Sequence, residues 1–201
     1  MALSPPGLNS AKWFCLLLCG FPMAPLLAEE YPWLRLKATE SGLGDVHVGM
    51  ALTQASENFV ISFLDATYFY GNTDCASYAF GDGQQGEQWH VRFLVENHVL
   101  QRIDIYTPAI KSVDGFGVGT DMQEVTAYYE GRYSVEMGYD PSDRHIRVPQ
   151  SDGWALEYTG HGTLTVDEGH RARLTPDEVL TGPLHRWSMG NLDAGTVEGC
   201  L

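Results

Sequence analysis

Positive charge is scarce in this sequence. The chain has 12 lysines and arginines against 26 aspartates and glutamates, which gives a formal net charge of −14 at pH 7. A surface this acidic repels nucleic acid and anionic lipid, so we expect no nucleic-acid partner. It would attract a basic protein, although the same charge also serves plain solubility.

Long hydrophobic runs are also missing. The apolar run near the N-terminus follows Lys12 and is interrupted by Pro22 and Pro25, so it is shorter than the ~20 residues that a membrane-spanning helix needs. A single positive charge, a short apolar run and a small residue, Ala28, are typical of a secretory signal peptide. We therefore predict a signal peptide at residues 1–28, no stable membrane insertion, and a periplasmic or secreted location.

Two alternatives stay open for this segment. An uncleaved N-terminal anchor would keep the chain at the membrane. Lipidation of Cys19 would do the same, but Leu18 stands where lipoprotein signals carry a small residue. The sequence favours cleavage after Ala28 over both.

Cysteine is scarce once residues 1–28 are removed. The chain has four cysteines, and only Cys75 and Cys200 lie beyond that segment. An even pair in an oxidising compartment predicts a disulfide. It would close a loop of about 125 residues and contribute roughly 4–5 kcal/mol by the chain-entropy estimate. No C-x-x-C motif occurs, and neither cysteine has a histidine close in sequence, so the sequence does not support a redox or metal role for the pair.

The common catalytic motifs are absent as well. The sequence contains no G-x-S-x-G for a serine nucleophile, and its glycine-rich pieces lack the lysine and the strand–loop–helix context of a phosphate-binding loop. Its adjacent acidic residues would face opposite sides of a strand. We identify no catalytic residue and no cofactor, which favours a binding role over an enzymatic one.

Histidines form the nearest approach to a metal site. His161 and His170 share one segment with Asp167 and Glu168, and His185 follows it. None has the i, i+4 spacing of a zinc-binding helix and no cysteine joins them, so we predict no metal site. A small periplasmic hydrolase or carbohydrate-acting enzyme that uses His161, His170 or Asp167 remains an alternative.

What the sequence does contain is an internal repeat. Gly44–Ala55 returns as Gly115–Val125, and each copy reads as a glycine turn followed by an amphipathic helix. In the second copy, Thr120 and Gln123 have the spacing of a capping box. The matched positions are Val48 with Val118, Gly49 with Gly119, Leu52 with Met122, Ala55 with Val125, and Phe59 with Tyr129.

Period-two patterns follow each predicted helix. They predict strands at 75–80, 89–95 and 99–106 in the first half, with a turn at 96–98, and strands at 153–158 and 184–189 in the second; 31–34 would be an additional first strand. Arg102 and Asp104 alternate with apolar residues, which predicts a sheet with one wet face. The fold class is therefore α+β, as two tandem repeats, each a short helix packed on an antiparallel β-sheet. Repeat one spans 29–112, and repeat two spans 113–201 with an inserted loop at 159–183.

Two groups of residues are candidates for partner binding. Tyr68, Phe69 and Tyr70 are three consecutive rings beside a turn, so they cannot all face one core; we interpret them as part of a loop, where exposed rings make protein or sugar contacts. The inserted loop is long enough to be functional. Its candidates are His161, Asp167, Glu168 and His170.

These motifs resemble known exported proteins. The Val-x-Val-Gly-Met turn at 46–50, the helix that follows and the antiparallel strands, in a unit that occurs twice, resemble the tandem unit of the β-lactamase-inhibitor proteins. The same unit occurs singly in the small outer-membrane assembly lipoproteins. Leu100–Asp104 (Leu-x-Arg-Ile-Asp) and Val197–Cys200 (Val-Glu-Gly-Cys) are similar to segments of uncharacterised exported bacterial proteins. The resemblance implies a fold, and no partner-contact residue of the inhibitor family matches a motif here.

From these features we expect a monomeric binding protein. It would be of the inhibitor or immunity type and would bind another protein, such as a basic enzyme or toxin, through an acidic surface that contains aromatic residues. An envelope scaffold protein is the remaining alternative.

Overall fold

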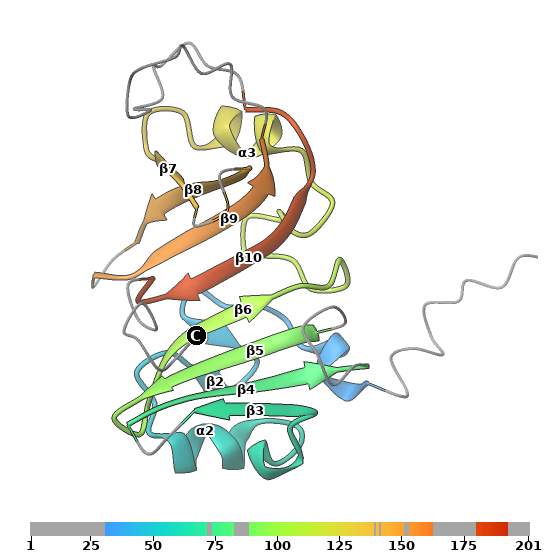
Figure 1. Cartoon of the computed structure of the whole chain (residues 1–201), viewed down its shortest axis with the longest axis vertical. Helices are drawn as coiled ribbons and strands as arrows, with labels where there is room; N and C mark the ends of the chain where they lie inside the picture. The colour runs from blue at the N-terminus through green and yellow to red at the C-terminus, as the bar shows by residue number, and fades with distance from the viewer. Residues whose placement is uncertain are drawn as a thin grey trace, which may run out of the picture.

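The protein is built on one long antiparallel sheet with two short α-helices (Figure 1). The computed structural model describes residues 31–71, 74–82, 89–138, 140, 142–150, 153–162 and 180–192. In spatial order the eight strands are β3 Tyr68–Gly71, β4 Cys75–Gly81, β5 Trp89–Glu96, β6 Val99–Ile105, β10 Leu184–Gly190, β9 Ala155–His161, β8 Asp143–Pro149 and β7 Ser134–Met137. The α+β class with an antiparallel sheet is confirmed.

Smaller elements complete the chain. The α-helices are α2 Leu52–Asn58 and α3 Met122–Tyr128, and a second sheet pairs β1 Gly42–Leu43 with β2 Val46–His47. Two short 3-10 helices, η1 Pro32–Arg35 and η2 Phe63–Asp65, lie before and after α2 in the sequence. Among the described residues, no helix has the length and hydrophobicity needed to cross a membrane.

Three strand predictions need correction. The strand expected at 31–34 is wrong, because Pro32 begins 3-10 helix η1, whose Trp33 is buried. Tyr68, Phe69 and Tyr70 were interpreted as part of a loop, but they form edge strand β3. Strands β7 and β8 were not predicted. Charged side chains in β8 hide its period-two pattern.

Both helices begin in the same way. Gly49 and Gly119 each have φ of +89°, a region that glycine adopts without steric cost. The Gly49 N–H donates to the carbonyl of Leu100 at 2.7 Å, and the Gly119 N–H donates to that of Leu184 at 2.8 Å. Each glycine turn is thereby attached to the first residues of β6 or β10, the two strands that meet at the centre of the sheet.

The start of α3 differs from the predicted capping box. Asp121 is the N-cap and its carboxylate accepts from the N–H of Gln123 at 2.8 Å. The hydroxyl of Thr120 instead accepts from the N–H of Gly117 at 3.1 Å. The cap therefore lies one residue later than the sequence pattern indicated, and Asp121 also suits the positive end of the helix.

The core lies between the helices and one face of the sheet. Ala55 and Phe59 from the first helical segment, and Met122, Val125 and Tyr129 from the second, are all buried, as their spacing predicted. Leu52, the remaining residue of the predicted face, is only half-buried. Apolar side chains of the sheet meet these helices, while the alternate residues point to the opposite face.

Several predicted features lie outside the described residues. These are the signal peptide at 1–28, Cys200 of the predicted disulfide, and Asp167, Glu168 and His170 of the inserted loop. Of that loop, residues 159–161 belong to strand β9, and Leu180 is buried. The Cys75–Cys200 disulfide stays a prediction.

Replacing Phe93 with alanine should destabilise the protein by about 3–5 kcal/mol, because it opens a cavity in the core. Phe93 is fully buried, with its ring centroid 4.8 Å from those of Phe59 and Phe63. Phe69→Ala is the matched control, since Phe69 is 53% exposed. Urea unfolding should separate the two variants, and equal losses would contradict this description of the core.

Candidate functional sites

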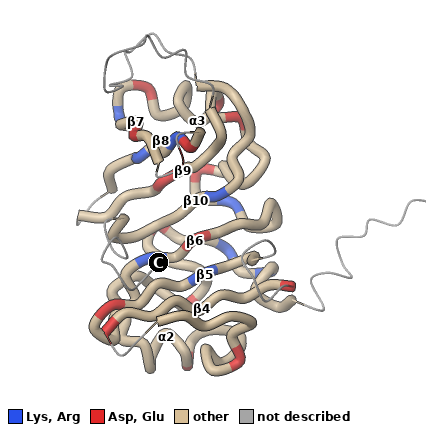
Figure 2. The backbone as a smooth tube through the Cα atoms, in the orientation of Figure 1, with Lys and Arg blue, Asp and Glu red and all other residues tan. Residues whose placement is uncertain are grey.

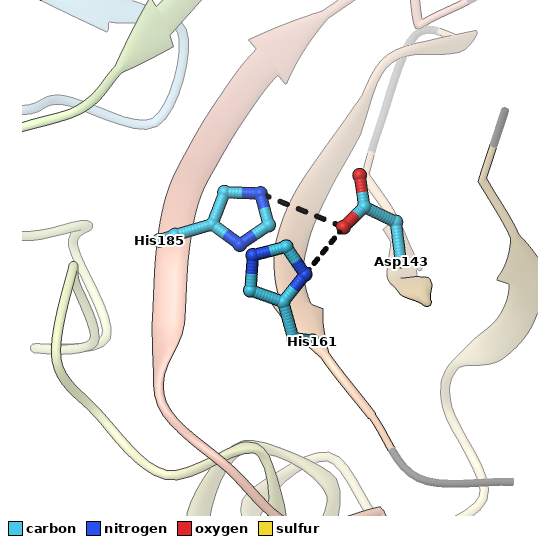
Figure 3. A group of neighbouring side chains, drawn as sticks. All are labelled: Asp143, His161 and His185. Atoms are coloured by element: carbon cyan, nitrogen blue, oxygen red, sulfur yellow. Dashed lines mark ion pairs between the residues drawn. The ribbon is translucent and has the colours of Figure 1, made fainter. Parts of the chain in front are cut away.

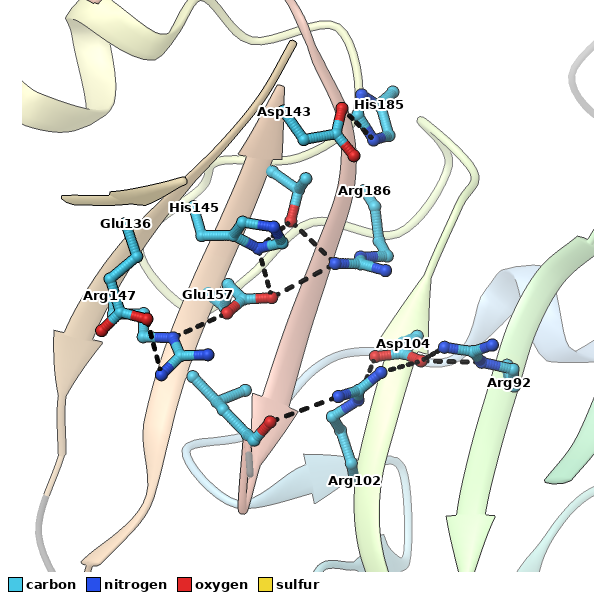
Figure 4. A network of polar contacts seen from close by, with 12 residues as sticks. Arg92, Arg102, Asp104, Glu136, Asp143, His145, Arg147, Glu157, His185 and Arg186 are labelled. Atoms are coloured by element: carbon cyan, nitrogen blue, oxygen red, sulfur yellow. Dashed lines mark hydrogen bonds and ion pairs between the residues drawn. The ribbon is translucent and has the colours of Figure 1, made fainter. Parts of the chain in front are cut away.

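A chain of charged side chains crosses the face of the sheet opposite the helices (Figure 4). We call this the polar face. It alternates with core residues on the same strands, as Arg92 does with Val91 and Phe93 on β5. Its charged members are Arg92, Arg102, Asp104, Glu136, His145, Arg147, Glu157 and Arg186.

Asp104 on β6 is the centre of the first half of this network. Its carboxylate accepts from Nε and Nη2 of Arg92 at 2.8 and 2.5 Å and pairs with Nε of Arg102 at 2.8 Å. Burial alone would raise the pKa of Asp104, but the charges of Arg102, Arg92 and Arg186 outweigh it and hold that pKa far below its usual range. The sheet face that was predicted to be solvent-exposed from Arg102 and Asp104 is thus polar. Asp104 itself, however, is fully buried.

Glu157 on β9 is the centre of the second half of this network. It pairs with Nδ1 of His145 and Nε of Arg147, each at 2.9 Å, and with Nη2 of Arg186 at 3.2 Å. Burial would raise the pKa of Glu157, but the bond and charge of His145, together with Arg147 and Arg186, lower it to about 2. Both carboxylates are therefore ionised and paired with neighbouring cationic side chains. These ion pairs at the centre of the polar face stabilise the fold.

A second cluster lies on β8, β9 and β10 and consists of Asp143, His161 and His185 (Figure 3). Asp143 and His161 are direct partners in the β8–β9 register, and His161 Nδ1 lies 3.0 Å from Asp143 Oδ1. His185 Nε2 lies 4.0 Å from the same oxygen. The two imidazole rings stack with centroids 4.5 Å apart.

A β-bulge brings His185 into this cluster. The β9–β10 register shifts between Leu184 and Arg186, so His185 is the extra residue. A bulge re-aims side chains that strict alternation would send to opposite faces. Figure 4 accordingly shows His185 beside Asp143 on the side of the sheet that also carries Arg186.

A third site lies at the edge of the sheet formed by β3. We call it the β3 patch and define it by two exposed apolar side chains next to Tyr78: Leu64 (93% exposed), which lines a hollow together with Tyr78, and Phe69 (53%), whose ring lies 5.1 Å from that of Tyr78. Tyr70 (43% exposed) follows Phe69 on the strand and points to the opposite face. Beside it is a hollow of about 300 Å³ lined by Leu52, Thr53, Ser56, Glu57, Phe63, Leu64 and Tyr78. Tyr68 is half-buried, with its ring 5.5 Å from that of Trp89.

The segment of sequence that carries the β3 patch has only acidic charges. The sequence has seven aspartates and glutamates, and no lysine or arginine, between Lys37 and Arg92. In Figure 2, α2 and β4 carry no basic position, and Glu57 makes α2 acidic. The arginines of β5, β6 and β10 lie nearer the middle of the sheet.

The predicted partner-binding residues are divided between two places. Phe69 and Tyr70 are exposed on β3, at one end of the strand order. His161 is on β9, two strands from the opposite edge, where it meets His185 and Asp143. Asp143 was missed because it belongs to strand β8, which was not predicted. Its place beside His161 depends on the β8–β9 register, and the sequence does not reveal that register before the strands are paired.

No protein-family model matches the sequence, and no curated protein matches it significantly. Among solved structures, the chain is similar to the crystal structure of the uncharacterized protein yfeY from Escherichia coli. The TM-score is 0.52 at 13% identity, over 77% of this chain and 99% of that chain. At such low identity the likeness concerns the fold alone.

Asp104→Asn should destabilise the protein by about 3–5 kcal/mol, because it leaves buried arginines without their counter-charge. Glu136→Gln is the matched control: the Glu136 side chain is 49% exposed and pairs with Arg147 at 3.0 Å. Exposed pairs contribute about 0–1 kcal/mol. Guanidinium unfolding at pH 7 measures both, and a small loss for Asp104→Asn would refute the central role of this carboxylate.

Acid should weaken the protein through Glu157. Its folded-state pKa of about 2 lies below the usual value of 4.5, so the stabilisation is complete above pH 4.5 and is lost as pH falls toward 2. The loss should be roughly 3 kcal/mol. Unfolding free energies of wild type and Glu157→Gln between pH 6 and pH 2 test this, and parallel pH profiles would contradict it.

Proposed function

We propose that this protein is an exported binding protein, of the inhibitor or immunity type, that docks a basic protein partner on its β3 patch. One observation carries the proposal: two large exposed apolar side chains, Leu64 and Phe69, lie next to Tyr78 at a sheet edge, within a segment of the chain that has acidic residues and no basic ones.

The apolar part of the patch supplies the contact. Leu64 and Phe69 are large side chains left in water, and burying each against a partner would be favourable by about 1.5–3 kcal/mol. Aromatic residues are enriched in protein interfaces and often dominate their energy. The hollow beside Leu64 offers a place for one side chain of the partner.

The edge strand offers a second means of contact. β3 pairs with β4 on one side and has no strand on its other side among the described residues. Its free backbone N–H and C=O groups can pair with an extended segment of another protein, as in strand addition. Natural sheets commonly protect such edges with lysine or proline, and Tyr68–Gly71 contains neither.

The acidic surroundings select the partner class. Glu57, Asp65 and Asp74 are exposed near the patch. They would steer a basic protein toward it and repel acidic proteins, nucleic acid and anionic lipid.

We further propose that the chain consists of two tandem repeats related to the β-lactamase-inhibitor unit. The matching φ angles of Gly49 and Gly119, and their matching bonds to Leu100 and Leu184, support this. In that description β3 and β7 are equivalent edges, and only β3 carries consecutive rings. Export by a cleaved signal peptide, a Cys75–Cys200 disulfide and a monomeric state belong to the same proposal.

The test is a pull-down from envelope extract with the purified protein at low salt and at about 1 M salt, where the Debye length falls to about 3 Å. We expect a basic protein to be captured at low salt and to be retained less at high salt. The double variant Leu64→Ser with Phe69→Ser should lose it. Mass spectrometry identifies what is captured.

Met137→Ser is the matched control, since Met137 is 51% exposed on β7 at the other edge. It should capture the same protein as wild type. Equal capture by the control and the double variant, or capture of acidic proteins at either salt concentration, would refute the proposed site.

A further inference from the structure

Asp143, His161 and His185 form a group whose donor atoms all lie within 4.8 Å of one another. We propose that they bind a divalent transition-metal ion of the zinc type through two imidazole nitrogens and one carboxylate oxygen. This site lies on β8, β9 and β10, apart from the β3 patch in the strand order, and does not depend on the proposed partner binding.

The distances suit such an ion. Zinc sits about 2.0–2.2 Å from histidine nitrogen and carboxylate oxygen, so its tetrahedral ligand atoms lie about 3.3–3.5 Å apart. His161 Nδ1 is 3.0 Å from Asp143 Oδ1, and His185 Nε2 is 4.0 Å from it. These two distances bracket the spacing that zinc needs, and one ligand atom of each residue lies within 4.8 Å of the others.

The types of ligand also point to this class of metal. Imidazole suits zinc, copper, iron and nickel, whereas magnesium and calcium prefer sites made of oxygen atoms alone. Two histidines and one carboxylate leave at least one coordination position for water or another ligand. The His161 side chain is 66% exposed, so an ion can reach the cluster from solvent.

The backbone brings all three residues together before any ion binds. Asp143 and His161 are fixed by the β8–β9 register, and the bulge in β10 sets His185 beside them. The neighbouring Asp140 carboxylate accepts from the hydroxyl of Ser142, which lies 3.4 Å from His161 Nδ1. Because this contact uses the same nitrogen as the proposed ligand, a bound ion would replace it.

Nearby charge does not prevent cation binding. Arg186 follows His185, but its guanidinium pairs with Glu157. Arg144 directs Nη1 to the backbone carbonyl of Asp143 at 2.7 Å.

Isothermal titration of the purified protein, prepared without a histidine tag, with Zn²⁺ alone tests the site. We expect one saturable ion per chain. Co²⁺ in its place should give visible absorption whose intensity reports the coordination number. Because loss of even an outer-shell contact costs 10–100-fold in affinity, His161→Gln and His185→Gln should each weaken Zn²⁺ binding at least about tenfold.

His98→Asn is the matched control. His98 lies in the β5–β6 turn with φ of +62°, a conformation that asparagine tolerates. The turn leads into the start of β6, which lies beside the end of β10, whereas His185 is near the start of β10. Circular dichroism would establish that each variant is folded. His161 is exposed, so at least His161→Gln should fold like wild type. Absence of saturable binding, or binding that both cluster variants retain at full affinity, would overturn the site.

Discussion

The pairing of β6 with β10 joins the two halves of the sheet, and a buried carboxylate sits on that seam. Asp104 lies opposite Arg92 on β5 and opposite Ser188 on β10. Arg186 adds its charge from the second half and also pairs with Glu157, so one guanidinium connects the two ionic groups. A charge buried in this way is tolerable only while its partners remain, which makes the seam sensitive to the loss of any one of them.

This network limits where the protein can act. Its carboxylates and guanidinium groups already satisfy one another across the middle of the sheet, so a ligand placed there would have to break strong pairs. The ends of the sheet have fewer such constraints. One end has apolar side chains and a free strand edge at β3, and toward the other, on β9, the exposed imidazole of His161 lies beside Asp143.

Sequence patterns predicted the parts of the fold that depend on local periodicity. The buried faces of both helices and five of the eight strands followed from apolar spacing. Strand β8 escaped because Arg144 is buried among its apolar positions while Asp143, His145 and Arg147 fill the other face. The cluster of Asp143 with two histidines was not predicted for a different reason. It depends on strand register and on a bulge, and neither can be inferred from any single segment of the sequence.

If the two halves are copies, as we propose, the cluster has a counterpart in the first half. Hydrogen bonds to the glycine turns match Leu184 with Leu100, so His185 corresponds to Gln101. The register pairs Asp143 with His161 in one half and Cys75 with Glu96 in the other. The same cross-strand position would then hold a predicted disulfide cysteine in the first half and a proposed metal ligand in the second. A scaffold shared by both halves does not require either chemistry, so the difference is best explained by separate roles acquired at the two positions.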